Sequence, residues 1–118
     1  MAIILGAVAV LQTMVESHAT LEEDLLFAAL EPHLGKHDGP LAILRAEHEE
    51  MKRLVWQIED AVDCDEAILL VEEALNAARR HFQKEEQVLF PMARRLLGDE
   101  ELTRLGSAWA EARRVAID

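Results

Sequence analysis

The pattern that sets the fold is HATLEEDLLF at residues 18–27, and it returns 63 residues later as HFQKEEQVLF at residues 81–90. The similarity continues to a Leu-Gly pair at residues 34–35 and again at residues 97–98. In each copy a histidine is followed four residues later by a glutamate. On a helix this spacing places an imidazole and a carboxylate one turn apart on the same face. The pattern therefore predicts two helices, each with a pair of metal-ligand side chains.

Composition agrees with a helical protein. The chain has 118 residues, only five glycines and three prolines, no tyrosine and 4% aromatic residues. This length suits one domain spanning residues 1–118, with a core of its own. The low content of turn-forming and aromatic residues favours helices over a sheet. We expect an all-α antiparallel bundle of three long helices and a short C-terminal helix.

Charge and cysteine content narrow the possible partners and compartments. The net charge of −11 argues against a nucleic-acid partner, which needs a basic surface. The uncharged residues 1–11 are too few for a membrane span and lack the basic leader of a signal peptide, so we expect a core helix and no membrane contact. A single cysteine, Cys64, suits a cytoplasmic protein. Phosphate-binding loops and Ser/His/Asp nucleophile motifs are absent from the sequence.

Turn signals divide the chain into four helical segments. The first is expected over residues 3–30, before the Pro and Gly residues at 32 and 35. The second begins at Pro40, a suitable first helical residue, and reaches Val62. Asp63 and Glu66 form a capping box for the third, which reaches residue 97 and stops at Gly98. The short fourth covers residues 100–115, and Pro91 should bend the third.

Hydrophobic spacing predicts which side chains face the interior. Steps of three and four residues produce one stripe on each long helix. The stripes are Ile4, Val8, Leu11, Val15, His18, Glu22, Leu25 and Ala29; Leu41, Leu44, His48, Met51, Val55, Ile58 and Val62; and Ala67, Val71, Ala74, Ala78, His81, Glu85, Val88 and Met92. Three histidines and two glutamates are thus expected inside the bundle.

Buried carboxylates are the strongest sign of a metal. A single core histidine is more often structural than a ligand, but an unpaired buried carboxylate costs several kcal/mol. No Arg or Lys lies on these stripes to offset the charges of Glu22 and Glu85. A cation bound by His18, Glu22, His48, His81 and Glu85 would do so, and iron suits such a mixed ligand set in a helical bundle.

Other polar and aromatic residues receive simpler interpretations. Glu23 and Glu86 point about 100° away from the ligand face, as solvated residues or partners of the ligands. The remaining assignments are a solvent-facing acidic run at Glu47, Glu49 and Glu50, surface histidines at His33 and His37, and packing residues at Trp56 and Trp109.

The ligand motifs resemble those of the hemerythrin-like family, the HHE cation-binding domain. The resemblance rests on His18-x-x-x-Glu22-Glu23, on Glu47-His48-Glu49 and on His81-x-x-x-Glu85-Glu86 through Pro91, and it covers about residues 10–97. It implies a four-helix bundle with a di-iron centre, in which Glu22 and Glu85 bridge the ions and His18, His48 and His81 are terminal ligands. It further implies binding of dioxygen or another small diatomic for storage, sensing or iron handling. An enzyme acting on peroxide or oxygen, and a metal-free interaction module, are the alternatives.

One helix of the family pattern has no counterpart here. The repeat would place another lone histidine 33 residues before His18, which the sequence does not contain. We therefore expect a site that is incomplete within one chain, and a homodimer formed through the apolar stripe Ile4, Val8, Leu11 and Val15. His33 or His37 could replace the absent ligand.

Overall fold

A computed structural model describes the backbone of residues 2–35 and 39–117, and the side chains of residues 6–35 and 39–112. Every element in these ranges is helical. The first helical stretch consists of α1 (Ala2–Leu21), the π-helical turn η1 (Glu22–Phe27) and α2 (Ala28–Leu34). The others are α3 (Pro40–Gln57) with the short 3₁₀ turn η2 (Ile58–Asp60), and α4 (Cys64–Lys84), the π-helical turn η3 (Glu85–Leu89) and α5 (Phe90–Ile117).

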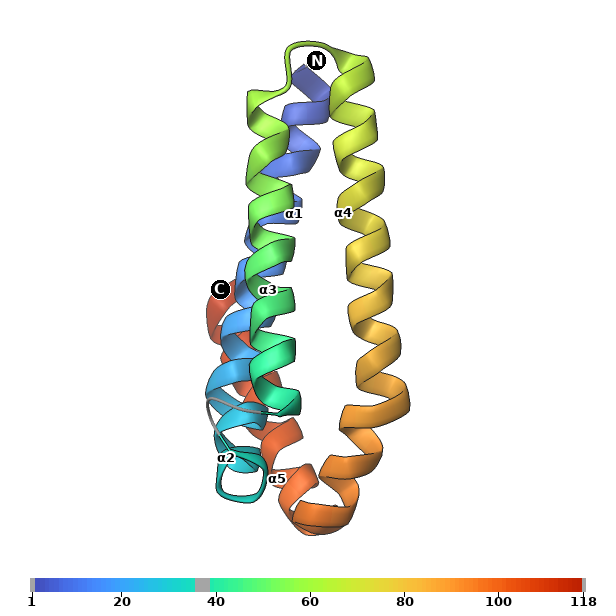
Figure 1. The fold of residues 1–118 in the computed structure, drawn as a ribbon. Coiled ribbons are helices and arrows are strands. Elements are labelled where there is room, and N and C mark those ends of the chain that lie inside the picture. Colours follow the sequence, from blue (N-terminus) through green and yellow to red (C-terminus); the bar gives the residue numbers. More distant parts are fainter. Residues whose placement is uncertain (1, 36–38, 118) are drawn as a thin grey trace.

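These helices form an antiparallel bundle, as the sequence predicts. Helix α3 packs against both α1 and α4, with the chain alternating in direction from one to the next (Figure 1). At Gly98 the chain turns, and the second half of α5 runs back along α2 and η1 (Figure 1). This returning half is the short C-terminal helix that the sequence predicts. It covers one end of the bundle.

Local stop and start signals act where the sequence places them. Gly35 and Gly98 have positive φ angles of 84° and 82°, a conformation that glycine adopts without a steric cost. Asp63 accepts a hydrogen bond of 2.8 Å from the backbone N–H of Glu66 and so caps α4. The carboxylate of Glu66 in turn accepts from the backbone N–H of Val62 at 3.1 Å.

The prediction that Val62 belongs to the core is wrong. The helical stretch ends at Asp60, Ala61 is extended (φ −63°, ψ 135°), and Val62 is 84% exposed. The reason is the capping interaction of the next helix. The backbone N–H of Val62 donates to the carboxylate of Glu66 in α4, so the chain leaves the preceding helix before Val62.

The two copies of the repeat share a structural irregularity that the sequence analysis missed. Each widens into a π-helical turn that begins at its predicted ligand glutamate, Glu22 in one copy and Glu85 in the other. π-Helical turns are rare in proteins, and many of those that do occur lie at functional sites. A wider turn rotates the following residues relative to an α-helix. Hence Leu26 and Leu89 are buried at equivalent positions, whereas the expected core residue Val88 is 51% exposed.

The same rotation corrects three other assignments. Leu25, Ala29 and Met92 are only partly buried, while Leu30 and Ala93 take their places in the core. Pro91, where the sequence predicts a bend, is the second residue of α5, just after η3 ends at Leu89. Ala28 holds the equivalent position in the first copy and also follows a π turn, so proline is not what the two irregularities have in common.

The core is divided along the length of the bundle. At the lower end in Figure 1 a large cluster is formed by Leu26, Phe27, Leu30, Leu41, Leu44, Leu89, Ala93 and Leu105. At the other end Val8 is only 3% exposed and packs with Ile58 and Ala67. The expectation that Val8 lies on an exposed apolar stripe is therefore wrong. Among the described helices, none combines the length and the apolar character that crossing a membrane requires.

Candidate metal centre

The five predicted ligand residues come together between the helices. His18 lies on α1, His48 on α3 and His81 on α4, while Glu22 and Glu85 are the first residues of the two π turns. One donor atom from each of His18, Glu22, His48 and His81 can be chosen so that all four lie within 4.8 Å of one another. Glu85 joins this group, because its Oε1 is 3.4 Å from Nε2 of His81 and 3.9 Å from Nε2 of His18.

The imidazole Nε2 atoms converge on the carboxylate of Glu22. Its Oε1 lies 3.0 Å from Nε2 of His48 and 3.6 Å from Nε2 of His81, and its Oε2 lies 3.2 Å from Nε2 of His18. The two Nε2 atoms of His48 and His81 are themselves 3.1 Å apart. Four of the five side chains are almost completely buried, and only His18 is partly exposed, at 31% of its side chain.

Several donor atoms at this centre are not satisfied by hydrogen bonds. Among the described residues, Nε2 of His18, Oε1 of Glu22 and Oε2 of Glu85 are buried and have no hydrogen bond of acceptable geometry. Leaving buried polar groups unpaired costs free energy, so native proteins rarely do so without a reason. Lone pairs from imidazoles and carboxylates directed at a common point are the donor set that a cation uses. The residues present therefore fit a metal ion.

The electrostatics of the protein without metal lead to the same conclusion. Burial acts to raise the pKa of Glu22, but its contacts with His18, His48 and His81 hold that pKa far below its usual range. The pKa of Glu85 is raised above its usual range, mainly by burial and next by the hydrogen bond and negative charge of Glu22. One carboxylate is thus ionised and the other protonated, because two adjacent buried charges of like sign repel each other. A bound cation would allow both to ionise.

Glu47, which the sequence assigns to a solvent-facing acidic run, instead contacts one of the candidate ligands. Its Oε1 accepts a hydrogen bond of 2.9 Å from Nδ1 of His81, and its other oxygen pairs with Lys84. Burial lowers the pKa of His81, but Glu22 and Glu47 outweigh burial and raise it. A carboxylate on Nδ1 leaves Nε2 as the nitrogen that faces the centre. No helix periodicity reveals this role, since the partners lie on different helices 34 residues apart.

Glu23 takes a comparable place beside His48. Its Oε2 is 3.6 Å from Nδ1 of His48, and its other oxygen is 3.7 Å from Nε of Arg45. Arg45 also pairs with Glu31 and lies over the ring of Phe27, 5.3 Å from its centroid. Of the two interpretations offered for Glu23, the structure favours a partner of a ligand, whereas Glu86 is exposed.

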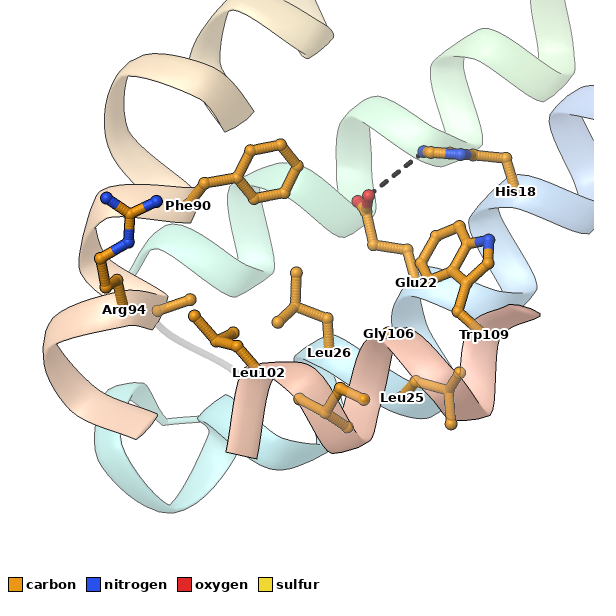
Figure 2. A pocket seen from close by; sticks show the side chains of 11 residues that line it. His18, Glu22, Leu25, Leu26, Phe90, Arg94, Leu102, Gly106 and Trp109 are labelled. Carbon is orange, nitrogen blue, oxygen red and sulfur yellow. Dashed lines mark ion pairs between the residues drawn. The ribbon is translucent and has the colours of Figure 1, made fainter. Parts of the chain in front are cut away.

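Aromatic rings enclose the imidazoles. The ring of Phe27 stacks on His48 with an interplanar angle of 4° and a centroid separation of 5.5 Å. Phe82 and Trp109 meet His18 edge-on, each at a centroid distance of 5.5 Å. Trp109 comes from the returning half of α5, and Figure 2 shows it next to the His18–Glu22 pair. These rings limit the access of water to the centre.

The remaining candidates that the structure describes are not part of this group. His33 is exposed near the end of α2, and His37 lies outside the described residues. Trp56, expected to be a packing residue, is 46% exposed and donates a hydrogen bond of 2.9 Å to Glu16. Cys64 is exposed.

Comparison with known proteins identifies a family. A family model described as "Hemerythrin HHE cation binding domain" matches residues 1–93 and again residues 40–116. The two matched ranges overlap over residues 40–93, which include α3, α4 and η3, as expected for a chain with an internal repeat. No curated protein and no solved structure matches the chain significantly.

Proposed function

The chain belongs to the hemerythrin HHE cation-binding domain family, and from this premise we propose that it binds iron and, through iron, dioxygen or a related diatomic. Storage, sensing and iron handling are the roles that such binding would serve. The observation that supports the proposal most directly is the convergence of three imidazole Nε2 atoms on the carboxylate of Glu22, with the carboxylate of Glu85 beside them and one oxygen of each carboxylate buried without a hydrogen bond. Mixed imidazole and carboxylate ligands of this kind suit iron.

The residues of the chain have separate tasks in this proposal. His18, Glu22, His48, His81 and Glu85 bind the metal. Iron at this position would supply a coordination site open to a small molecule. Glu47 holds the ring of His81, and fixing a ligand through its second nitrogen typically changes metal affinity by about 10- to 100-fold.

The compact ligand group accommodates a first ion. Two donors that each lie about 2.1 Å from one ion are at most about 4.2 Å apart. The separations of up to 4.8 Å among the four clustered donor atoms need only a small contraction to meet this limit. A second ion, as in a di-iron centre, would require further ligands from outside these five residues.

Metal analysis tests the proposal. We expect the purified protein loaded with Fe(II) to retain at least one iron per chain, and to show an absorption change with oxygen that reverses when oxygen is removed. The variant His48→Ala should lose iron, and His33→Ala, which removes an exposed histidine, should not. Iron retained equally by wild type and His48→Ala would contradict the proposal. Catalytic loss of hydrogen peroxide instead of reversible binding would identify a di-iron enzyme.

We also propose a homodimer, formed through a different surface from the one expected from sequence. Exposed apolar residues lie seven apart on one face of α4, at Ile68, Leu75 and Phe82. Val10 and Met14 form a second exposed pair on α1, at 60% and 62% exposure. Phe82 contacts the ring of His18, so a second copy that covers it would also shield the metal centre.

Sedimentation of charged variants tests the dimer. Because the net charge of −11 opposes association, a dimer must depend on apolar burial and should strengthen with salt. Met14→Glu should produce monomers, whereas Val62→Glu, a change at an exposed apolar residue of the α3–α4 connection, should not. A wild-type monomer at micromolar concentration would refute the dimer.

A further inference from the structure

A cavity of about 520 Å³ lies between the first helical stretch and α5, beside the metal centre. Two sides of it come from α5, before and after the turn at Gly98. Its walls are formed by His18, Glu22, Leu25, Leu26, Phe90, Ala93, Arg94, Leu102, Leu105, Gly106 and Trp109. Figure 2 shows Phe90 and Arg94 at one end, and His18 and Trp109 at the other.

The size of this cavity suits an organic molecule. Small-molecule sites typically have volumes of about 300 to 1,000 Å³, are mainly apolar, and contain a few polar groups that orient the ligand. A diatomic needs far less space, so the proposed oxygen chemistry leaves most of the cavity unexplained. Its middle is lined by Leu25, Leu26 and Leu102, which offer contacts only to an apolar body (Figure 2).

Arg94, at one end of the cavity, is the one Arg or Lys among its lining residues. Arg94 has no acidic partner among the described residues, although acidic residues outnumber basic ones in the chain, 23 to 12. Its guanidinium can bind a carboxylate through two parallel hydrogen bonds. The opposite end is formed by His18, Glu22 and Trp109, so Arg94 is the lining residue to which a carboxylate can pair. An amphipathic anion can therefore enter in only one favourable orientation.

We infer that this cavity binds a monocarboxylate with an apolar chain, of the size of a medium-chain fatty acid. The carboxylate pairs with Arg94, and the chain extends past the leucines towards Trp109. Gly106 leaves room for it, since a Cβ atom at this position would meet no other atom within 4 Å. The inference does not depend on which metal is bound, because Arg94 and the apolar walls belong to the chain itself.

Fluorescence of Trp109 provides the assay. In a Trp56→Phe background Trp109 is the only tryptophan, and it lines the cavity. Octanoate, below its micelle-forming concentration, should change this emission in a saturable way, in both metal-free and iron-loaded protein. Arg94→Gln should weaken octanoate binding about tenfold, the loss expected for one charge-assisted contact. Arg95→Gln, an equal change of charge at the next residue, should leave the affinity unchanged.

Two further measurements separate the cavity from a general apolar surface. Octanol has the same chain without the charge, so it should bind to the wild type more weakly than octanoate does. Its affinity should be the same for Arg94→Gln as for the wild type. Gly106→Leu should fill the cavity and abolish binding while the helical circular dichroism is retained. Equal binding of octanol and octanoate to wild type, or equal effects of Arg94→Gln and Arg95→Gln, would overturn the inference. Loss of iron binding with octanoate binding intact would contradict only the proposed metal function.

Discussion

Replacing Glu85 by glutamine should separate the stability of the folded chain from its affinity for metal. In the metal-free protein Glu85 is protonated, since burial and then Glu22 raise its pKa. The amide of glutamine resembles a protonated carboxyl in shape and can still donate a hydrogen bond to Glu22. We therefore expect metal-free Glu85→Gln to unfold at nearly the same temperature as metal-free wild type.

With metal present the two proteins should differ. At a free iron concentration 100 times Kd, binding stabilises the wild type by about 2.7 kcal/mol, or roughly 10 °C in Tm for a chain of this length. If loss of the carboxylate weakens binding 100-fold, the same iron concentration stabilises Glu85→Gln by only about 0.4 kcal/mol. Thermal unfolding followed by circular dichroism, with metal analysis of the same samples, measures both quantities.

Two matched variants make the result specific. Glu86→Gln removes a charge from the adjacent exposed residue and should keep the full stabilisation by iron. Glu22→Gln should destabilise even the metal-free protein, because Glu22 is ionised there and contacts three histidines. If Glu85→Gln bound as much iron as wild type and gained as much stability from it, Glu85 would not be a ligand.

Three other outcomes are expected. Glu47→Gln should weaken iron binding by about 10- to 100-fold in a metal titration, and Glu49→Gln on the exposed face of α3 should not. Equal iron affinities of the two variants would show that Glu47 does not position His81. Because the fold raises the pKa of both Glu85 and His81, the folded metal-free chain holds more protons than the unfolded chain. Its unfolding free energy should therefore rise as the pH falls from about 8 to 6, whereas that of the iron-loaded protein should fall as protons displace the metal; parallel pH profiles would contradict the ligand assignment. Gly106→Ala should raise the Tm of the metal-free protein by about 4 °C, since alanine is favoured in a helix by about 1 kcal/mol and its Cβ meets no neighbour; an unchanged Tm would show that the helix is not limiting there.

The candidate ligand residues could be selected from sequence because their signals are local. A histidine and a glutamate four residues apart share a helix face in any straight helix, and the copy at His81 and Glu85 repeats the pair at His18 and Glu22. The helix boundaries at Gly35, Gly98 and Asp63 depend on backbone angles and on hydrogen bonds within three residues. A short stretch of sequence contains all the information that such features need.

Other features depend on contacts between distant segments. The π turns after Glu22 and Glu85 rotate the helices so that Leu26 and Leu89 are buried, and no α-helical periodicity anticipates this change of face. Glu47 reaches His81 on the neighbouring helix only because α3 and α4 pack at one particular register.

The amino-acid order thus specifies the helices, their ends and the five candidate ligand residues, all of which follow from interactions within about one helical turn. The packing of the helices specifies what surrounds those ligands. Glu47 beside His81, Trp109 beside His18, and the cavity that ends at Arg94 each join residues far apart in the chain. Their positions are set by how whole helix faces fit together, because burial and shape depend on the partner surface and not on the local sequence.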